Sequence, residues 1–279
     1  MKIAVLSDIH ANLPALRAVL EHVDSLAPHV VIVGGDVINR GPQPQECLDL
    51  VLDRVQHHGW RILKGNHEDY VLQAARGLAH LNVWERAVCA HSAWTAETVR
   101  DALPLIRSWP DQVEVTAPDG SHLICFHASR KGNRVGLYEF MGEEELREHV
   151  TGPASAICVG HTHVPFVRYV DGTLLVNSGA VGMPFDGDPR ASYAWIEWSP
   201  TGWRAENMRV PYDRDETRAA YRSTGYLENG GVMVKLMMRE LDEAAPWLGK
   251  WHRDYEADVV AGRMTVEASV EAILARPPG

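Results

Sequence analysis

"KIAVLSDIHANLPALRAVLEHVDSLAPHVVIVGGD", residues 2–36, places a helical pattern between two short apolar runs. Each apolar run is continuous rather than alternating, which is typical of strands covered on both faces. Residues 13–26 between them carry apolar side chains at helical spacing. A second helical pattern at 44–58 and a third apolar run at 60–65 extend the series. This order predicts a β-α-β-α-β unit, the basis of an α/β fold.

Further apolar runs predict more strands along the chain. The predicted strands are residues 2–7, 29–35, 60–65, 121–127, 155–160, 172–179 and 192–198. The later runs are separated mainly by turns, and Asp171-Gly172 marks a hairpin, so we predict a second, more antiparallel sheet. Beyond about Tyr212 the pattern is helical with no further strand. We therefore expect one domain at 1–212 and a helical C-terminal extension at 213–279 that packs on it.

Composition and charge limit the classes of partner. The chain has 279 residues, of which 46% are hydrophobic and 23% charged, as in ordinary soluble globular proteins. Its formal net charge of −10 provides no basic surface that could follow a long phosphate backbone. A long nucleic acid is therefore not the expected partner. A small phosphorylated ligand is compatible with the charge, because bound cations can reverse the local sign of an acidic site.

The N-terminal sequence and the cysteines indicate a cytoplasmic location. "MKIAVLSD" reaches an aspartate too early for a signal peptide, and no apolar run is long enough to span a membrane. The 4 cysteines are well separated and lie in apolar stretches without C-x-x-C pairs. They are expected to be buried thiols in a reducing compartment.

Polar side chains gather where the apolar runs end. They are Asp8, His10, Asp36, Asn66, His67, His127, His161 and His163. Each of them alone could cap a helix or lie in a loop, but the carboxyl ends of strands in an α/β sheet converge on one crevice. Carboxylate, imidazole and amide groups without thiolates suit divalent ions such as Mn²⁺, Fe²⁺ or Zn²⁺. These side chains are too many for one tetrahedral site, which predicts two metal ions.

The ordered motifs resemble those of the calcineurin-like binuclear metallophosphoesterases. The matching blocks are D-x-H at Asp8, G-D at Gly35, G-N-H-E at Gly65, a lone histidine at 127 and G-H-x-H at Gly160. Single blocks are weakly specific, whereas their order over residues 8–163 is highly specific. The resemblance implies a four-layer fold in which two mixed β-sheets are flanked by helices.

The resemblance also implies a role for each matching residue. One ion would be held by Asp8, His10 and His163, the other by Asn66, His127 and His161, and Asp36 would bridge them. A metal-bridging hydroxide would attack phosphorus in line, while His67 would act as the general acid. The expected cofactors are two divalent ions, Mn²⁺ first, with Fe, Zn, Ni or Co as alternatives.

Several further residues are predicted to contact substrate. Arg40 matches an arginine that reaches phosphate oxygens in the protein-phosphatase and diadenosine-tetraphosphatase branches of the family. In the protein-phosphatase branch an aspartate precedes this arginine, whereas Asn39 stands here, so Glu68 or Asp69 could orient His67 instead. The other candidates lie in loops at strand ends and are Asn12, Arg130 and Arg190, with Ser129, Asp186 and Asp188 beside them. Asn12 fits a helix cap equally well.

The predicted function is hydrolysis of small phosphorylated substrates, with nucleotide phosphodiesters first. The alternatives are a dinucleoside-polyphosphate hydrolase, suggested by Arg40, a serine/threonine protein phosphatase, disfavoured by Asn39, and a catalytically inactive metal-dependent binding scaffold. The segment 213–279 is expected to pack beside the metal cleft, to restrict substrate size and to favour a homodimer.

Overall fold

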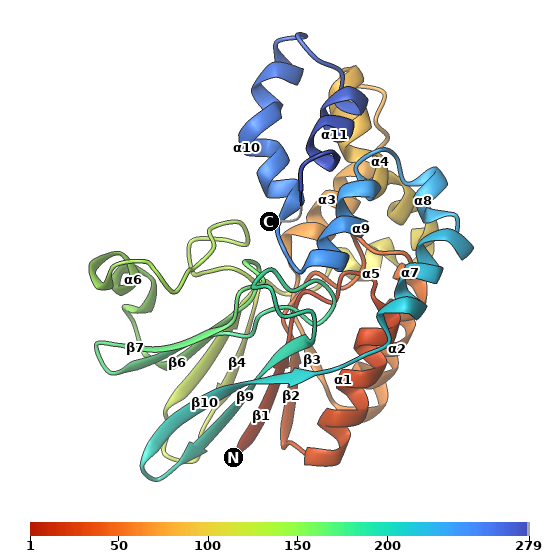
Figure 1. Ribbon diagram of the computed structural model, residues 1–279. Helices are drawn as coiled ribbons and strands as arrows, with labels where there is room; N and C mark the ends of the chain where they lie inside the picture. Colours follow the sequence, from red (N-terminus) through yellow and green to blue (C-terminus); the bar gives the residue numbers. More distant parts are fainter. Residues whose placement is uncertain (278–279) are drawn as a thin grey trace.

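The computed structural model describes residues 1–277 and contains two five-stranded sheets (Figure 1). The first sheet has the order β10-β9-β1-β2-β3 and the second has the order β4-β5-β6-β8-β7. The strands are β1 (Lys2–Leu6), β2 (Val30–Val33), β3 (Arg61–Ile62), β4 (Gln112–Thr116), β5 (His122–Phe126), β6 (Ala154–Val159), β7 (Phe166–Val170), β8 (Thr173–Asn177), β9 (Ala191–Ser199) and β10 (Gly202–Val210). The predicted α/β architecture with two mixed sheets is confirmed.

Both sheets are equally mixed, so the prediction of a more antiparallel second sheet is wrong. In the first sheet β1 pairs in parallel with β2 and β2 with β3, while β9 lies antiparallel to both β1 and β10. In the second sheet β5-β6 and β6-β8 are parallel, and β4-β5 and β7-β8 are antiparallel. The error arose because the β9–β10 hairpin, late in the chain, returns to the edge of β1 and completes the first sheet.

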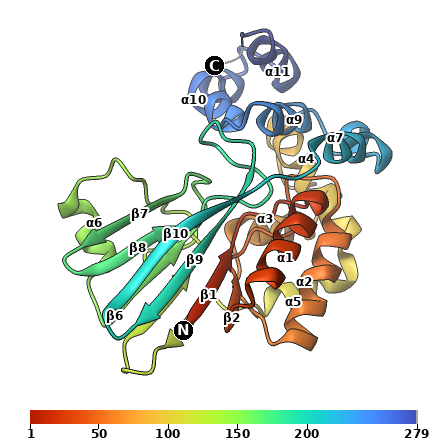
Figure 2. The ribbon, with the colours of Figure 1, turned by 60° about the horizontal axis from the view of Figure 1, so that its bottom comes forward.

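The two sheets pack face to face between helices, which gives four layers (Figures 1 and 2). Apolar side chains of β1, β2, β4, β5, β6, β8, β9 and β10 form the core between the sheets. Helices α1 (Leu13–Leu26) and α2 (Pro44–His58) cover the outer face of the first sheet, and α6 (Glu143–Val150) covers the second. Burial of both sheet faces explains why the parallel strands have continuous apolar sequences.

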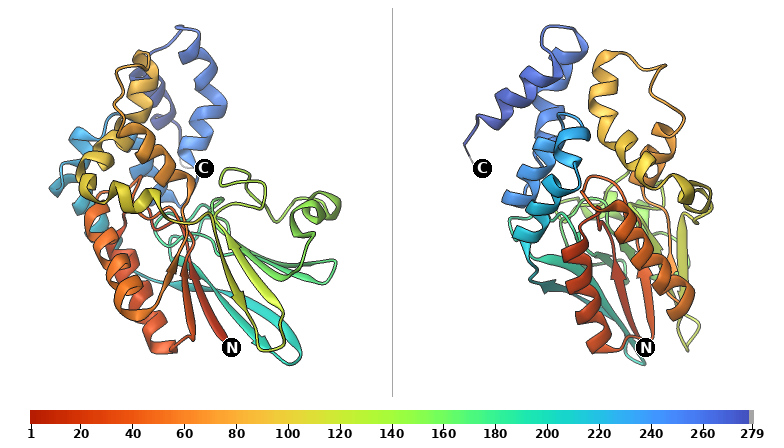
Figure 3. Two further views of the ribbon diagram at one scale, coloured as in Figure 1. Left: turned by 180° about the vertical axis from the view of Figure 1, so that it is seen from behind. Right: turned by 90° about the vertical axis from the view of Figure 1, so that its right-hand side faces the viewer.

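Two groups of helices lie at the end of the sandwich where the parallel strands finish (Figure 3). The first group is α3 (Asn66–Ala74), α4 (Val83–Thr98), the 3₁₀ turn η1 (Arg100–Ala102) and α5 (Leu103–Arg107). The second group is α7 (Arg214–Ser223), α8 (Tyr226–Asn229), α9 (Val234–Glu243), α10 (Trp247–Val260) and α11 (Val266–Leu274). The first group was not predicted, because its sequence between β3 and β4 has weak apolar periodicity.

The C-terminal helices share an apolar core with α4. Trp247 and Trp251 of α10 are almost fully buried in this core, and Trp84 and Trp94 of α4 pack against it. Met183, from the loop after β8, joins the same core. The C-terminal segment is therefore attached both to the helices after β3 and to the loop at the end of the second sheet. Within residues 1–277, no helix combines the length and the apolar character that membrane crossing requires.

Candidate metal centre

Two clusters of potential ligands lie where the strands end. The first contains Asp8, His10 and His163, and the second contains Asp36, His127 and His161. In each cluster, one potential ligand atom per residue lies within 4.8 Å of the others. His10 Nε2 and His163 Nε2 are 3.1 Å apart, close enough to face one ion. The structure thus brings together side chains that the sequence spreads over more than 150 residues.

In both Asp8 and Asp36, one carboxylate oxygen accepts a backbone N–H and the other faces the centre. Asp8 accepts the His161 backbone N–H through Oδ2 at 2.9 Å, and Asp36 accepts the His67 backbone N–H through Oδ1 at 2.8 Å. The remaining oxygens, Asp8 Oδ1 and Asp36 Oδ2, are buried and have no hydrogen-bond donor among the described residues. Because an unpaired buried carboxylate oxygen is costly, a cation beside each of these oxygens would be stabilising.

Asp36 Oδ2 lies between the two clusters. It is 3.2 Å from His127 Nε2 and 3.7 Å from His10 Nε2, which belong to different clusters. Asp8 Oδ1 instead lies 3.2 Å from His163 Nε2, within its own cluster. This geometry suits Asp36, and not Asp8, for the bridging position.

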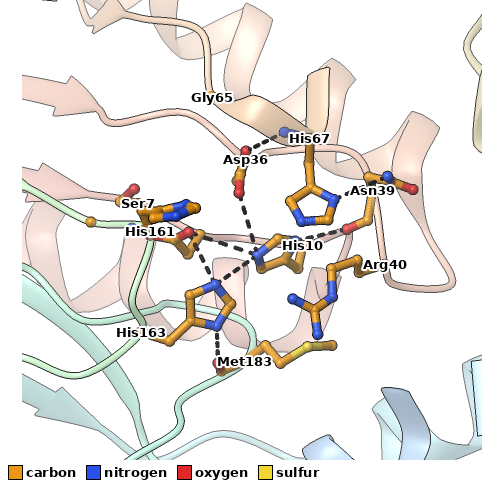
Figure 4. Close-up of polar contacts among 12 residues, drawn as sticks. Ser7, His10, Asp36, Asn39, Arg40, Gly65, His67, His161, His163 and Met183 are labelled. Atoms are coloured by element: carbon orange, nitrogen blue, oxygen red, sulfur yellow. Dashed lines mark hydrogen bonds and ion pairs between the residues drawn. The ribbon is translucent and has the colours of Figure 1, made fainter. Parts of the chain in front are cut away.

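Backbone carbonyls orient three of the histidine rings. The Nδ1 atoms of His10, His127 and His163 lie 2.9, 2.9 and 2.6 Å from the carbonyl oxygens of Asn39, Gly34 and Met183. Figure 4 shows the contacts of His10 and His163. A carbonyl can only accept, so each Nδ1 donates a proton and each Nε2 is the ring atom that faces the centre. This arrangement is the usual support for a metal-binding histidine.

Asn66 completes the second cluster. Its Oδ1 lies 2.9 Å from both His127 Nε2 and His161 Nδ1. His161 and His163 therefore face different clusters, His161 with Asn66 and His163 with His10. The two histidines of "GHTH" are separated in this way although only one residue stands between them.

The backbone around the centre is unusually strained. Positive φ angles occur at Asp8 (57°), Asp36 (55°), His161 (66°) and His163 (60°), a region that non-glycine residues rarely adopt. Such outliers cluster at functional sites, where the surrounding structure compensates for their cost. Glycine is needed at 160, because a Cβ there would lie 2.4 Å from Asp8 Oδ2.

The buried charges form a site that attracts cations. Burial opposes ionisation of Asp8, but the neighbouring His163 and His10 hold its pKa well below the usual range. Burial likewise opposes a charge on His127, yet the adjacent Asp36 carboxylate raises the pKa of His127 to about 10. The ionised carboxylates therefore stabilise positive charge on neighbouring groups. Two carboxylates, four imidazoles and the Asn66 amide oxygen are suitable ligands for two divalent ions.

His67 stands beside the clusters and belongs to neither. Its ring is edge-on to His10, with the ring centroids 5.0 Å apart. Asn39 Nδ2 lies 3.1 Å from His67 Nδ1, and the same amide contacts Ser92, His91 and Thr95 (Figure 4). Burial lowers the pKa of His67 well below its ordinary value despite the opposing effect of Asp36.

The expectation that Glu68 or Asp69 orients His67 is wrong. The Glu68 carboxylate accepts the backbone N–H groups of Gly65, Asp36 and Val37 at 2.7–2.8 Å, and so holds two ligand-bearing loops together. Asp69 pairs with Lys64 and Asn133. Burial, reinforced by the charge of Asp36, raises the pKa of Glu68 to about 7.

Arg40 approaches the centre from its own strand-end loop. Its side chain is buried, and its Nη2 donates to Glu240 of α9. The guanidinium lies 5.5 Å from the Phe185 ring, which itself stacks on His163 with centroids 4.3 Å apart. Arg40 Nε is buried and has no acceptor among the described residues. Figure 4 places the guanidinium beside His10, His67 and His163.

The remaining predicted substrate residues differ in their surroundings. Asn12 caps α1 and is fully engaged with Ala15, Gly182, Tyr212 and Thr217, so the structure gives it the capping role rather than the substrate role. Arg190 is exposed, and its Nε and Nη2 donate to Asp188. These contacts lie within the loop that carries both residues.

Arg130 and Ser129 line a polar cavity of about 500 Å³ that reaches His127. Arg130 is exposed, and its Nη1 donates to the Thr151 carbonyl at 2.6 Å. The loop after β8 meets the centre through Met183 and Phe185, not through Asp186, which pairs with Arg209. Glu240 and Phe185 were missed because nothing local in the sequence connects them with residues so distant along the chain.

Comparisons with known proteins agree with this geometry. A family described as the calcineurin-like phosphoesterase superfamily domain matches residues 1–200. An uncharacterized protein of Methanocaldococcus jannaschii is 30% identical over 227 residues, which cover 76% of this chain and 88% of that protein.

Two solved structures share the fold. A metallophosphoesterase from Sphaerobacter thermophilus is 27% identical with a TM-score of 0.66, and the match covers 88% of this chain and 100% of that one. A hypothetical protein from Pyrococcus horikoshii OT3 has a TM-score of 0.70 at 15% identity, covering 84% of this chain and 97% of that one. The chain belongs to the calcineurin-like phosphoesterase superfamily.

Proposed function

We propose that this protein is a binuclear-metal-dependent phosphoesterase that hydrolyses small phosphodiesters, with nucleotides as the leading substrate class. The observation that carries the proposal is the pair of clusters, each with a buried carboxylate oxygen that lacks a donor within the described chain. His67 and Arg40 lie beside them, so an acid and an anion-binding cation border the place where a phosphate would bind.

The residues present fit two divalent ions. Asp8, His10 and His163 would hold one ion, Asn66, His127 and His161 the other, and Asp36 would contact both. When bound, such ions activate water and stabilise the charge that develops on phosphate oxygens. Mn²⁺ suits these nitrogen and oxygen ligands, as do Fe, Zn, Ni and Co.

His67 is proposed as the general acid. Its Nδ1 faces the Asn39 amide, which leaves Nε2 to hold a proton and pass it to the leaving oxygen. The pKa of His67 is low mainly because the ring is buried. The negative charge of a bound phosphate would raise this pKa and so favour the charged imidazole. Its ring is held but not ligated, as a proton donor requires.

Arg40 is proposed to bind phosphate oxygens. Glu240 holds one end of the guanidinium, which leaves the buried Nε without an acceptor among residues 1–277. A guanidinium presents several donors in a fixed plane, so it can serve a carboxylate and a phosphate together. Binding of a phosphate oxygen would satisfy the unpaired Nε–H.

Two separate cavities favour a diester over a monoester. The polar cavity touches His127 and contains Arg130, while a second cavity of about 430 Å³ touches Asn66 and His67. The two cavities share no lining residue, so each could receive one substituent of a phosphodiester. A monoester would use only one of them.

A dinucleoside polyphosphate is the second candidate. Lys64, Arg130 and Lys131 line the polar cavity and could contact additional phosphates. However, Lys64 is paired with Asp69 and Lys131 with Glu148, which reduces their free charge. The diester is therefore preferred over the polyphosphate.

A substrate panel at matched Mn²⁺ concentration tests the proposal. We expect the highest kcat/KM for nucleotide phosphodiesters, compared with a dinucleoside polyphosphate, a nucleotide monoester and a phosphopeptide. A preference for the polyphosphate would select the second candidate, and a preference for the phosphopeptide would select a protein phosphatase. No turnover with any of several divalent metals would favour a binding scaffold.

A further inference from the structure

The second cavity lies between α3 and α4 on one side and α10 on the other, and Asn66 and His67 of the predicted site belong to its wall. The loop between α3 and α4 also lines the cavity. Its lining residues are Asn66, His67, Tyr70, Gln73, Ala74, Leu78, His80, Leu81, Glu85, Val88, Cys89, His91, Ser92, Leu248 and His252. Its volume of about 430 Å³ is within the range of small-molecule sites.

The candidate general acid lines this cavity. His67 and the potential ligand Asn66 belong to its wall, so the cavity borders the place where a leaving oxygen would receive its proton. An organic group bonded to that oxygen has to continue away from His67. Tyr70 also lines the cavity, with its ring edge-on to that of His67 and the centroids 5.2 Å apart.

The cavity wall combines apolar and polar side chains. Leu78, Leu81, Val88 and Leu248 provide apolar contacts along its length, and Tyr70 adds an aromatic ring. Polar side chains are also present, among them the exposed Gln73, His80 and His252. An aromatic heterocycle needs both kinds of contact, because its faces are apolar and its edge carries donors and acceptors.

Glu240 links the cavity wall to Arg40 by hydrogen bonds. Glu240 accepts the Leu248 backbone N–H through Oε1 at 2.8 Å, while its Oε2 accepts from Arg40. One buried carboxylate thus fixes both a proposed phosphate-binding group and the start of α10, from which Leu248 and His252 enter the cavity. A ligand that reached from the Arg40 guanidinium into the cavity would contact groups that Glu240 joins.

We propose that this cavity binds the base of the nucleoside that carries the leaving oxygen. The inference rests on the proposed phosphodiesterase function and adds the part of the substrate that these helices recognise. The helices α3, α4 and α10 then determine substrate choice, while the strand-end residues carry out the chemistry.

The first test compares two substrates that differ only in the base. A nucleoside 2′,3′-cyclic phosphate and the 2′,3′-cyclic phosphate of 1-O-methylribose share the reacting ring and the leaving oxygen. We expect the base to raise kcat/KM about tenfold or more, as stacking and burial of one base should do. Equal kcat/KM values for the two substrates would overturn the inference while leaving phosphodiester hydrolysis intact.

Two substitutions place a charge in the cavity and a third serves as control. Leu81→Asp and Leu248→Asp alter partly buried wall residues, whereas Leu105→Asp alters an exposed leucine of α5 outside the cavity. We expect the ratio of kcat/KM between the two substrates to fall towards 1 in both wall variants and to stay at the wild-type value in Leu105→Asp. An unchanged ratio in both wall variants would overturn the inference.

Cys89 gives a second readout that needs neither turnover nor substitution. It lines the cavity and is partly exposed, whereas Cys47, Cys125 and Cys158 are buried. Alkylation of Cys89 by a maleimide, followed by mass spectrometry, should be slowed by free adenosine and not by ribose. If the protein hydrolyses no phosphodiester, the proposed function fails, and this measurement still shows separately whether the cavity binds a nucleoside. Equal alkylation rates with and without saturating adenosine would overturn it.

Discussion

Arg40 and Glu240, 200 positions apart, form a buried ion pair that joins the metal centre to helix α9. Glu240 is fully buried and also binds the backbone of Leu248. The C-terminal helices therefore do more than cover an apolar surface, because they hold a residue of the site in place. The Arg40–Glu240 ion pair should therefore affect both the stability of the protein and its binding of substrate.

Removal of the Glu240 carboxylate should destabilise the protein and weaken substrate binding. Glu240→Ala leaves Arg40 charged and buried without its partner, which costs about 3–5 kcal/mol of unfolding free energy. KM should rise because the guanidinium loses its fixed position. Urea unfolding and steady-state kinetics measure the two effects.

The exposed Glu228 provides the matched control. Glu228→Ala should change stability by less than about 0.5 kcal/mol. A Glu240→Ala variant that is as stable as Glu228→Ala would show that the ion pair does not support the site.

His67→Ala should reduce kcat and retain the metals. General acid catalysis contributes about 10²–10⁴-fold, so kcat should fall within that range. Metal content, measured by mass spectrometry of digested protein, should equal that of wild type, since His67 belongs to neither cluster. His58→Ala, at an exposed position of α2, should leave both quantities unchanged. Loss of metal from His67→Ala would refute the assigned role.

Asn39→Asp should shift the pH dependence of kcat. The Asn39 amide contacts His67 Nδ1 at 3.1 Å, and a carboxylate there would favour the charged imidazole. The pKa of His67 should rise, so the protonated acid should persist to higher pH and the basic limb of the kcat profile should move upward. Asn39→Ala should lower kcat without this upward movement. Identical profiles for Asn39→Asp and wild type would argue against proton transfer by His67.

Asp36→Asn should lower the metal content of both clusters. The amide keeps an oxygen for the His67 N–H, so the backbone contact is retained while the charge between His10 and His127 is lost. Fewer than two ions per chain should remain after dialysis. Asp53→Asn, at an exposed site on α2, should bind metal as wild type does. Normal metal content in Asp36→Asn would exclude the bridging position.

The clusters could be predicted from sequence because strand ends have a simple geometry. Parallel strands finish at one edge of a sheet, which brings together Asp8 and Asp36 after β1 and β2 of the first sheet, and His127 and His161 after β5 and β6 of the second. The assignment of His161 and His163 to different clusters came from the resemblance to the family and not from this rule, because both residues follow the same strand.

Contacts made by helices could not be predicted in the same way. Glu240 and Leu248 meet the site only because α9 and α10 dock on α4 through a core of large apolar side chains. An amphipathic pattern predicts that a helix packs somewhere and does not identify the surface. The pairing of β9 with β1 was missed for a related reason, because apolar alternation does not determine which sheet a late strand joins.

The central claim is that two metal ions act together in phosphodiester hydrolysis. The most direct measurement is a titration of metal-depleted protein with Mn²⁺, followed by hydrolysis of bis(p-nitrophenyl) phosphate at each addition. The account predicts that activity rises until two equivalents per chain have been added and then remains constant. Full activity at one equivalent, or activity that does not depend on metal, would contradict it.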